Sequence, residues 1–471
     1  MSPDMTRNLT ICGGFIAVYI ITFTFFVIKR KFRSPEKSWK NSLINVALTP
    51  LRIFKVGPYA HGKISLEGSM KSAIKKTKLN DFGGKGADFV EMYGKIMNSV
   101  SFKNQKFHNL GYISANIEIS MALARRLTLV EYLKENPKVL DIPVRAPVFV
   151  MGLPRTGTTF LHRLLSLDPA VRAPITWELL NPVPKVNGNT DMVAHGKDRV
   201  KRRNYIDGIL SQRKSMGDEA IAHIHEVETD LPEECLLCLT DHLPCLPMLL
   251  YDCYMNIDAF LTVDSTDAYT TYKKYLQLLS YQTNDDTTPK GWMLKCPAHL
   301  FYPKQIASVF PDAKLIWNHR HPVSAVPSLC SLLKAFHQLY YEPECRDECE
   351  LGKKIKYVSE KLLMQAPKDI EESGLESANV VYNELIKDPS NTVKKIYKTF
   401  NWDYTVEYDT ILQAYLAKNR AEREVMKKKN ASKGAALHTY TPEEFGLTTA
   451  ELQQGDFAKY AEKYNIPLSK G

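Results

Sequence analysis

The residues Gly152-Leu-Pro-Arg155-Thr-Gly157-Thr-Thr159 decide the fold, because they lie between an apolar run and a helical pattern. Residues 146–151 are apolar and partly β-branched, which favours a buried strand, and the apolar spacing becomes helical from Phe160 onward. A strand, a glycine-rich turn and a helix in this order bind anions through backbone N–H groups at the helix N-terminus. The sequence therefore predicts an anion-binding loop at residues 152–159.

The loop matches the G-x4-G-x-[ST] spacing of phosphate-binding loops, with one departure. A P-loop nucleotidase carries a lysine that reaches the β- and γ-phosphates, whereas Thr158 stands at that position here. Arg155 supplies a cation three residues earlier. The loop is therefore suited to a 5′-phosphate group and poorly suited to triphosphate chemistry. A turn that binds no ligand is the plainer alternative.

Two further apolar runs, at residues 313–319 and 379–385, predict buried strands with helical stretches around them. Strands that alternate with helices are typical of a parallel sheet. The predicted fold class is thus α/β, with a P-loop-like, mostly parallel sheet flanked by helices and an N-terminal transmembrane helix.

The transmembrane helix is predicted from residues 9–28, an uncharged run of 20 residues. At ~1.5 Å per residue this run crosses a hydrocarbon core of ~30 Å. It is longer than the apolar part of a signal peptide, and no small-residue cleavage site follows it. The predicted organisation is a short tail (1–8), a single-pass membrane anchor (9–28), a basic juxtamembrane linker (29–80), a helical lead-in (81–145) and one α/β domain (146–471).

The charge distribution argues against a nucleic-acid-binding protein. The chain carries a net charge of +10, but residues 1–80 carry +11 and the remaining 391 residues carry −1. The basic excess is local to the membrane-proximal tail, so no nucleic-acid partner is predicted. The basic residues that follow the anchor predict a domain that faces the cytosol, whereas the glycosylation sequon at Asn430 indicates a luminal one.

One cysteine and histidine cluster is a candidate for zinc, namely Cys235-x2-Cys238-x3-His242-x2-Cys245. Cys235 and Cys238 lie inside the apolar run CLLCL, where free cysteines behave as small hydrophobic side chains. The spacing also differs from the common zinc frameworks. We therefore predict no metal site.

Residues 147–178 (PVFVMGLPRTGTTFLHRLLSLDPAVRAPITWE) resemble the 5′-phosphosulfate loop of sulfotransferases that use 3′-phosphoadenosine 5′-phosphosulfate (PAPS). They are similar to the bacterial-type branch and to the tyrosylprotein sulfotransferases. Residues 292–297 and 310–328 resemble the family's Lys-x-Pro and 3′-phosphate elements. Residues 380–402 and 438–447 match two later segments, so the resemblance covers about residues 87 to 465.

The resemblance implies that a sulfonate group moves from PAPS to a hydroxyl or amine of an acceptor that the sequence does not identify, without a metal. PAPS carries a 3′-phosphate in addition to its transferable sulfonate, so two anion sites are expected. The residues implied in PAPS binding are Arg155, Thr156, Gly157, Thr158 and Thr159 of the loop, Arg320 and Ser328 for the 3′-phosphate, and Lys433 in a basic-glycine loop. A Golgi location is also implied, since membrane sulfotransferases often reside there.

The acceptor must lose a proton, so a general base is expected beside the transferring sulfur. Glu178 is the first candidate, because tyrosylprotein sulfotransferases place a catalytic glutamate two positions earlier in this segment. His299 is the second, because an unperturbed pKa of ~6.5 suits a base near neutrality. Lys295 is expected to stabilise charge on the leaving oxygen.

Two other functions stay open at this point. A P-loop nucleotide kinase would bind ATP with Mg²⁺, although the missing loop lysine argues against it. An inactive membrane-anchored scaffold of the same fold would bind nucleotide without turnover.

Overall fold

The computed structural model describes residues 39–56, 64–83, 94, 107–186, 192–215, 227–243, 264–283, 291–432 and 440–468. The predicted anchor, residues 9–28, and the predicted nucleotide-binding residue Lys433 lie outside these ranges. Across the described ranges, no helix is both long enough and apolar enough to cross a bilayer.

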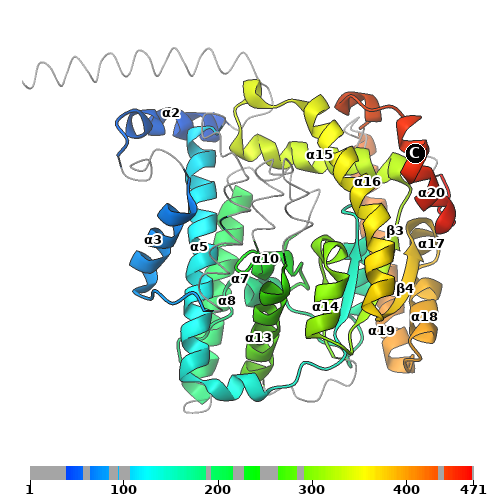
Figure 1. Ribbon diagram of the computed structural model, residues 1–471, viewed down its shortest axis with the longest axis horizontal. Coiled ribbons are helices and arrows are strands. Elements are labelled where there is room, and N and C mark those ends of the chain that lie inside the picture. Colours follow the sequence, from blue (N-terminus) through cyan, green and yellow to red (C-terminus); the bar gives the residue numbers. More distant parts are fainter. Residues whose placement is uncertain are drawn as a thin grey trace, which may run out of the picture.

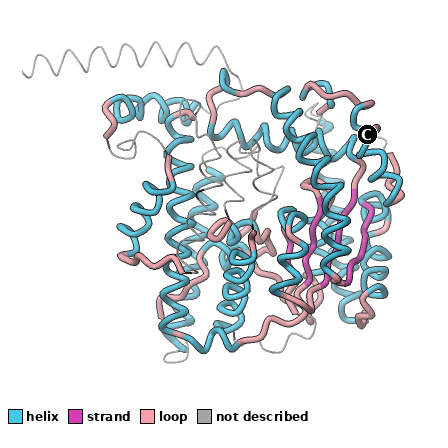
Figure 2. Tube along the Cα trace, in the orientation of Figure 1, coloured by secondary structure: helices cyan, strands magenta, loops and turns pink. Residues whose placement is uncertain are grey.

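A four-stranded sheet with the order β2-β1-β3-β4 forms the centre of the α/β domain, and all three pairings are parallel (Figure 2). The strands are β1 (Val148–Gly152), β2 (Met293–Lys295), β3 (Lys314–His319) and β4 (Glu376–Val381). The predicted parallel sheet is therefore confirmed. The run predicted as one strand at 379–385 is divided, because β4 ends at Val381 and a helix begins at Tyr382.

Alternating side chains of β1 contribute to two separate cores. Val148 and Val150 pack on one face of the sheet, and Phe149 and Met151 pack on the other. The helices of the first face are α6 (Thr158–Leu165), α17 (Tyr382–Lys387), α18 (Pro389–Thr399) and α19 (Val406–Ser432). Those of the second face include α13 (Thr266–Thr283), α14 (Pro303–Val309), α15 (Pro322–Tyr340), α16 (Glu348–Ser373) and α20 (Gly455–Lys463) (Figure 1).

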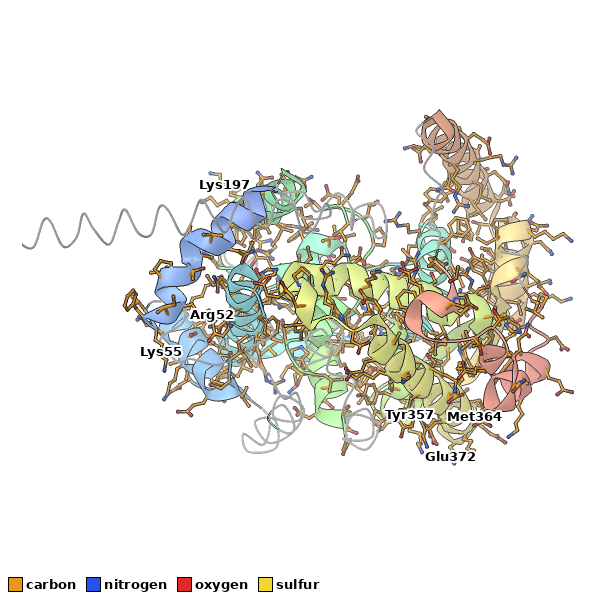
Figure 3. The ribbon with its side chains drawn as sticks, turned by 90° about the horizontal axis from the view of Figure 1, so that it is seen from above. Arg52, Lys55, Lys197, Tyr357, Met364 and Glu372 are labelled. Carbon is orange, nitrogen blue, oxygen red and sulfur yellow. The ribbon has the colours of Figure 1, made fainter. Side chains whose placement is uncertain are left out.

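Two helices of the predicted linker pack on the rest of the molecule. Helices α2 (Trp39–Ile53) and α3 (Leu66–Thr77) lie against the long helix α5 (Asn109–Glu135). Ala73 of α3 is fully buried, and Arg52 Nη1 of α2 donates to the carbonyl oxygen of Phe107 over 2.8 Å. Figure 3 shows Arg52 and Lys55 at the edge of the molecule opposite α18 and α20. Much of the segment between 39 and 80 is therefore folded structure rather than a free linker.

The remaining elements of the described ranges are one long helix and several short ones. They are α7 (Thr176–Leu180), α8 (Met192–Ser215), α10 (Leu236–Leu239), and the 3₁₀ turns η2 (Pro137–Asp141), η4 (Pro297–Phe301), η5 (Pro343–Cys345), η6 (Pro442–Phe445) and η7 (Glu451–Gln453).

The parallel sheet determines where a site can form. Each strand carries a residue of interest at its carboxyl end: the loop follows β1, Lys295 ends β2, Arg320 follows β3 and Tyr382 follows β4. In open α/β sheets, ligands bind in the crevice outside these carboxyl ends. The four segments therefore meet at one edge of the sheet.

Candidate active site

The loop between β1 and α6 owes its shape to left-handed backbone positions. Arg155 has φ of 71° and Gly157 has φ of 88°. A Cβ atom on Gly157 would lie 2.9 Å from Cδ2 of Tyr382, so this position needs glycine for space as well as for backbone freedom. Thr156 is buried, and its Oγ1 donates to the carbonyl oxygen of Leu153 over 2.7 Å. These contacts fix a turn that ends in the N-terminus of α6.

Thr158 and Thr159 form the first turn of α6, directly after the loop. The first N–H groups of a helix lack acceptors within the helix, and its dipole attracts negative charge. The N-terminus of α6 is therefore suited to an anion, as the sequence predicts.

Arg155, Arg320 and Ser328 come together although they are far apart in the sequence. Arg155 Nε donates to Ser328 Oγ over 3.2 Å, and Arg320 Nη1 donates to the carbonyl oxygen of Arg155 over 2.8 Å. The guanidinium carbon of Arg320 lies 4.4 Å from the ring centroid of Tyr382. Within the described residues, Arg320 Nε is buried and has no hydrogen-bond partner. A buried donor of this kind is expensive unless a ligand accepts from it.

Two guanidinium groups therefore sit beside one loop. Burial, together with the nearby Arg320, lowers the pKa of Arg155 from its usual range. Mutual repulsion of this kind is relieved when an anion binds between or beside the cations.

Lys295 reaches from the end of β2 to the first turn of α6. Its side chain is fully buried, and Nζ donates to Thr159 Oγ1 over 3.1 Å. Nζ also forms an ion pair with the carboxylate of Glu234, which the sequence analysis did not single out. The backbone N–H of Cys235 donates to the carbonyl oxygen of Lys295 over 2.9 Å and holds Glu234 beside the strand end. The sequence signal that could have identified Glu234 is the acidic pair Glu233-Glu234 next to an apolar run.

Glu178 lies in a different set of contacts. Its carboxylate accepts hydrogen bonds from Arg172 Nη2 and from the backbone N–H of Ile175, each over 3.3 Å, and Arg199 lies 3.7 Å away. The guanidinium carbon of Arg172 lies 4.4 Å from the ring centroid of Trp292, which precedes β2. The structure thus joins Glu178 to the start of β2, whereas Lys295 stands at the other end of that strand.

His299 is fully buried in η4, behind Lys295. Its Nδ1 shares a hydrogen bond of 2.8 Å with the hydroxyl of Tyr269, while Nε2 has no partner among the described residues. Burial, reinforced by the ammonium group of Lys295, lowers the pKa of His299 to about 3. A group with so low a pKa is a weak proton acceptor near neutrality.

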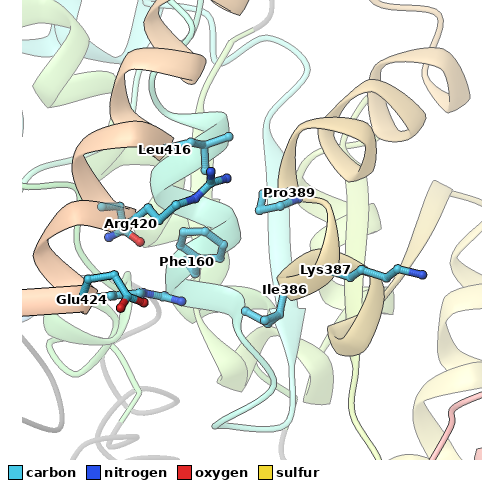
Figure 4. A pocket seen from close by; sticks show the side chains of 9 residues that line it. Phe160, Ile386, Lys387, Pro389, Leu416, Arg420 and Glu424 are labelled. Atoms are coloured by element: carbon cyan, nitrogen blue, oxygen red, sulfur yellow. The ribbon is translucent and has the colours of Figure 1, made fainter. Parts of the chain in front are cut away.

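A pocket of about 240 Å³ opens beside the loop, between α6, α17 and α19 (Figure 4). Phe160 of α6 and Ile386 of α17 supply apolar surface, and Lys387 and Arg420 supply positive charge. The guanidinium carbon of Arg423 lies 5.2 Å from the ring centroid of Phe160. The pocket therefore combines cations with an aromatic ring, Phe160, which follows the predicted anion-binding loop in the first turns of α6.

The cysteine cluster is part of the apolar core where the structure describes it. Cys235 and Cys238 are buried thiols, and the hydroxyl of Tyr272 donates to Cys235 Sγ over 3.0 Å. Burial raises the pKa of Cys235 to about 11, so the thiol stays protonated. Cys245 lies outside the described residues.

Comparison with known sequences identifies relatives of one kind. The profile of the sulfotransferase family matches residues 147–406. The omega-hydroxy-beta-dihydromenaquinone-9 sulfotransferases Stf3 of Mycobacterium bovis and Mycobacterium tuberculosis are each 26% identical to the chain over 201 residues. That match covers 41% of this chain and 47% of each relative, so the chain spans about half the length of the curated relatives it matches.

Solved structures with the same arrangement cover most of the chain. Sulfotransferase STF9 from Mycobacterium avium has a TM-score of 0.69 and 27% identity, and the match covers 86% of this chain and 98% of that one. Sulfotransferase STF1 from Mycobacterium tuberculosis has a TM-score of 0.68 and 24% identity, with 84% and 98% covered. The second likeness supports the fold alone.

Proposed function

The chain belongs to the sulfotransferase family, and from this premise we propose that it transfers a sulfonate group from PAPS to a hydroxyl or amine of an acceptor. The observation that carries the proposal is the convergence of Arg155, Arg320 and Ser328 beside the loop. An adenosine nucleotide with a single 5′-phosphate needs one anion site. PAPS needs two, and the loop and the Arg320 side chain supply them.

The two anion sites have different donors. The loop, from Arg155 to Thr159, offers backbone N–H groups and hydroxyls to the 5′-phosphosulfate. The buried Nε of Arg320, which has no partner among the described residues, offers a charge-assisted hydrogen bond to the 3′-phosphate, with Ser328 beside it. Lys295 lies at the first turn of α6, where it can stabilise charge on the leaving oxygen.

The pocket beside α6 is suited to the nucleobase. Phe160 follows the loop directly, and any nucleobase can stack on an aromatic ring of this kind. Ile386 extends the apolar surface, and Arg420 adds positive charge to the lining. We therefore include Phe160 among the donor-binding residues, although the sequence analysis did not.

Calorimetric titration of the full-length chain in detergent tests this proposal. The ligands are adenosine 3′,5′-bisphosphate, 5′-AMP and ATP with Mg²⁺. We expect the bisphosphate to bind most tightly, and Arg320→Ala to weaken that binding roughly 10- to 100-fold while 5′-AMP binding changes little. Arg203→Ala is the matched control, since Arg203 is exposed on α8 and paired with Asp230.

Three results would overturn the proposal. Tighter binding of ATP with Mg²⁺ would favour a nucleotide kinase. Bisphosphate binding without sulfonate transfer to any acceptor would favour an inactive scaffold. Equal binding of the bisphosphate and 5′-AMP would remove the second anion site. The acceptor screen uses radiolabelled PAPS. It begins with hydroxyl compounds, because the mycobacterial relative is named for an omega-hydroxy compound.

A further inference from the structure

Glu234 is placed at the reacting end of the site by backbone contacts on both sides. The N–H of Cys235 is bonded to the carbonyl oxygen of Lys295, and the N–H of Glu233 donates to the carbonyl oxygen of Pro174 over 3.2 Å. The carboxylate of Glu234 then meets Lys295 Nζ, whose other partner is Thr159 Oγ1. Lys295 therefore links the Glu234 carboxylate to the first turn of α6.

A carboxylate at this place opposes the binding of an anionic donor. The site otherwise gathers the cations Arg155, Lys295 and Arg320 and a helix N-terminus. A negative charge near a sulfonate costs binding free energy, because like charges repel strongly where water is excluded. The ion pair with Lys295 offsets part of this cost, but it also reduces the positive charge that Lys295 offers to the leaving oxygen. Proton transfer from the acceptor is a role that accounts for a carboxylate at this position.

The geometry of Lys295 allows that role. An ammonium group has three N–H donors, of which one points to Thr159 and one to Glu234. Among the contacts of the described residues, the third N–H is left for the oxygen that leaves the sulfur. Lys295 can therefore contact the leaving oxygen and also hold the Glu234 carboxylate near the same sulfonate group.

We infer that Glu234 is the catalytic residue that removes the acceptor's proton, and this inference rests on the proposed sulfotransferase function. A bond forms between the acceptor oxygen or nitrogen and the sulfur, and the bond from sulfur to the 5′-phosphate oxygen breaks. The acceptor's proton moves to the Glu234 carboxylate, and adenosine 3′,5′-bisphosphate leaves. The Glu234 side chain is 17% exposed, so the proton can then pass to water.

The two bases expected from the sequence are less well placed for this step. Glu178 is held by Arg172, Arg199 and a backbone N–H. His299 has its Nδ1 bonded to Tyr269 and lies fully buried. Glu234 has a single side-chain partner among the contacts described, and that partner is itself needed by the reaction.

The test compares three variants of the full-length chain: Glu234→Gln, Glu234→Ala and, as the matched buried carboxylate, Glu178→Gln. Sulfonate transfer from radiolabelled PAPS is measured with a phenol, a primary alcohol and a primary amine, alone and with added formate. Binding of adenosine 3′,5′-bisphosphate is measured by calorimetry. We expect Glu234→Gln to lower kcat roughly 10²- to 10⁴-fold. Its bisphosphate affinity stays equal or rises, because a negative charge has been removed.

Formate separates a proton acceptor from a structural carboxylate. It is expected to restore part of the rate to Glu234→Ala and none to Glu234→Gln, because only the alanine variant vacates space for a small carboxylate. Wild-type rates in Glu234→Gln would overturn the inference, and so would an equal loss of turnover in Glu178→Gln. Loss of bisphosphate binding in Glu234→Gln would show that Glu234 only positions Lys295. Failure of the wild-type chain to prefer the bisphosphate would instead count against the proposed function.

Discussion

Two regions of the molecule bury charge in opposite ways. The loop region, which comprises residues 152–159 with Lys295, Arg320 and Ser328, gathers three cations, one of which, Lys295, forms an ion pair with Glu234. It also leaves a buried guanidinium nitrogen without a partner among the described residues. The bracing segment, residues 172–180, matches its arginine with a carboxylate and adds hydrogen bonds to neighbouring backbone. Removing one partner of a buried ion pair destabilises a fold, whereas like charges held together favour the binding of a counter-ion. We therefore expect substitutions in the first region to affect activity and those in the second to affect stability.

Among substitutions that compare these two regions, the largest effect is expected from Lys295→Met. The change removes the donor to Thr159 and the partner of Glu234, while a chain of similar length still fills the buried space. Turnover should fall roughly 10²- to 10³-fold, the usual loss when one donor to a developing oxyanion is removed. Lys304→Met is the control, because Lys304 forms an exposed ion pair with Glu372. An equal loss of turnover in both variants would contradict the assignment of Lys295 to the site.

Glu178→Gln should lower the stability of the fold and leave bisphosphate binding unchanged. It leaves Arg172 buried without its countercharge, and breaking a buried ion pair costs about 3 kcal/mol of unfolding free energy. Denaturant unfolding measures that loss, and calorimetry should find the affinity for adenosine 3′,5′-bisphosphate unchanged. If stability is kept while turnover collapses, Glu178 is the general base that the sequence predicted, and the comparison of the two regions fails.

A smaller effect tests the shape of the loop. Gly157→Ala adds a Cβ atom 2.9 Å from the Tyr382 ring at a left-handed backbone position, and that ring packs under Arg320. Binding of the bisphosphate should weaken roughly 10-fold, which corresponds to about 1.4 kcal/mol. Gly374→Ala provides the control, because Gly374 has φ of 68° with nothing near its added Cβ. Gly374 lies at the end of α16, away from the loop, so Gly374→Ala should bind the bisphosphate like the wild-type chain. Equal affinities in the two variants would contradict the dependence of binding on the shape of the loop.

The loop region was predictable because its signals are local. The residues 152–159 follow a strand in the sequence, and Arg320 and Ser328 belong to one strand-to-helix segment. A parallel sheet brings the carboxyl ends of its strands together, so neighbouring strands suffice to predict the cluster. The order of the strands and the end of β4 at Val381 were not predictable, since apolar runs do not mark where a buried strand becomes a helix.

Glu234 could not be found in the same way. It reaches Lys295 through a backbone bond between Cys235 and the end of β2, across a separation of 61 residues that no periodic pattern encodes. Glu178 was chosen from its position after the loop. Its partners Arg172 and Arg199 come from other turns and helices, and their approach depends on tertiary packing. Glu234 lies in a loop whose position depends on tertiary contacts, and the contacts of Glu178 in α7 depend on such contacts as well.

The smallest effect concerns the buried histidines of the two sheet faces. Burial, with help from Lys295, lowers the pKa values of His162 and His299 to about 3, so both are neutral in the folded chain. In the unfolded chain they take up protons below their usual pKa of ~6.5. Their contribution to stability is thus complete above pH 6.5 and declines as the pH falls toward 3. Between pH 7 and 6 the loss is less than about 1 kcal/mol for each histidine. Denaturant unfolding at these two pH values should give a smaller difference for His162→Gln than for the wild-type chain. If the difference in unfolding free energy were the same for both chains, His162 would have the same pKa in the folded and unfolded states. Its burial beside β2 would then not lower its pKa.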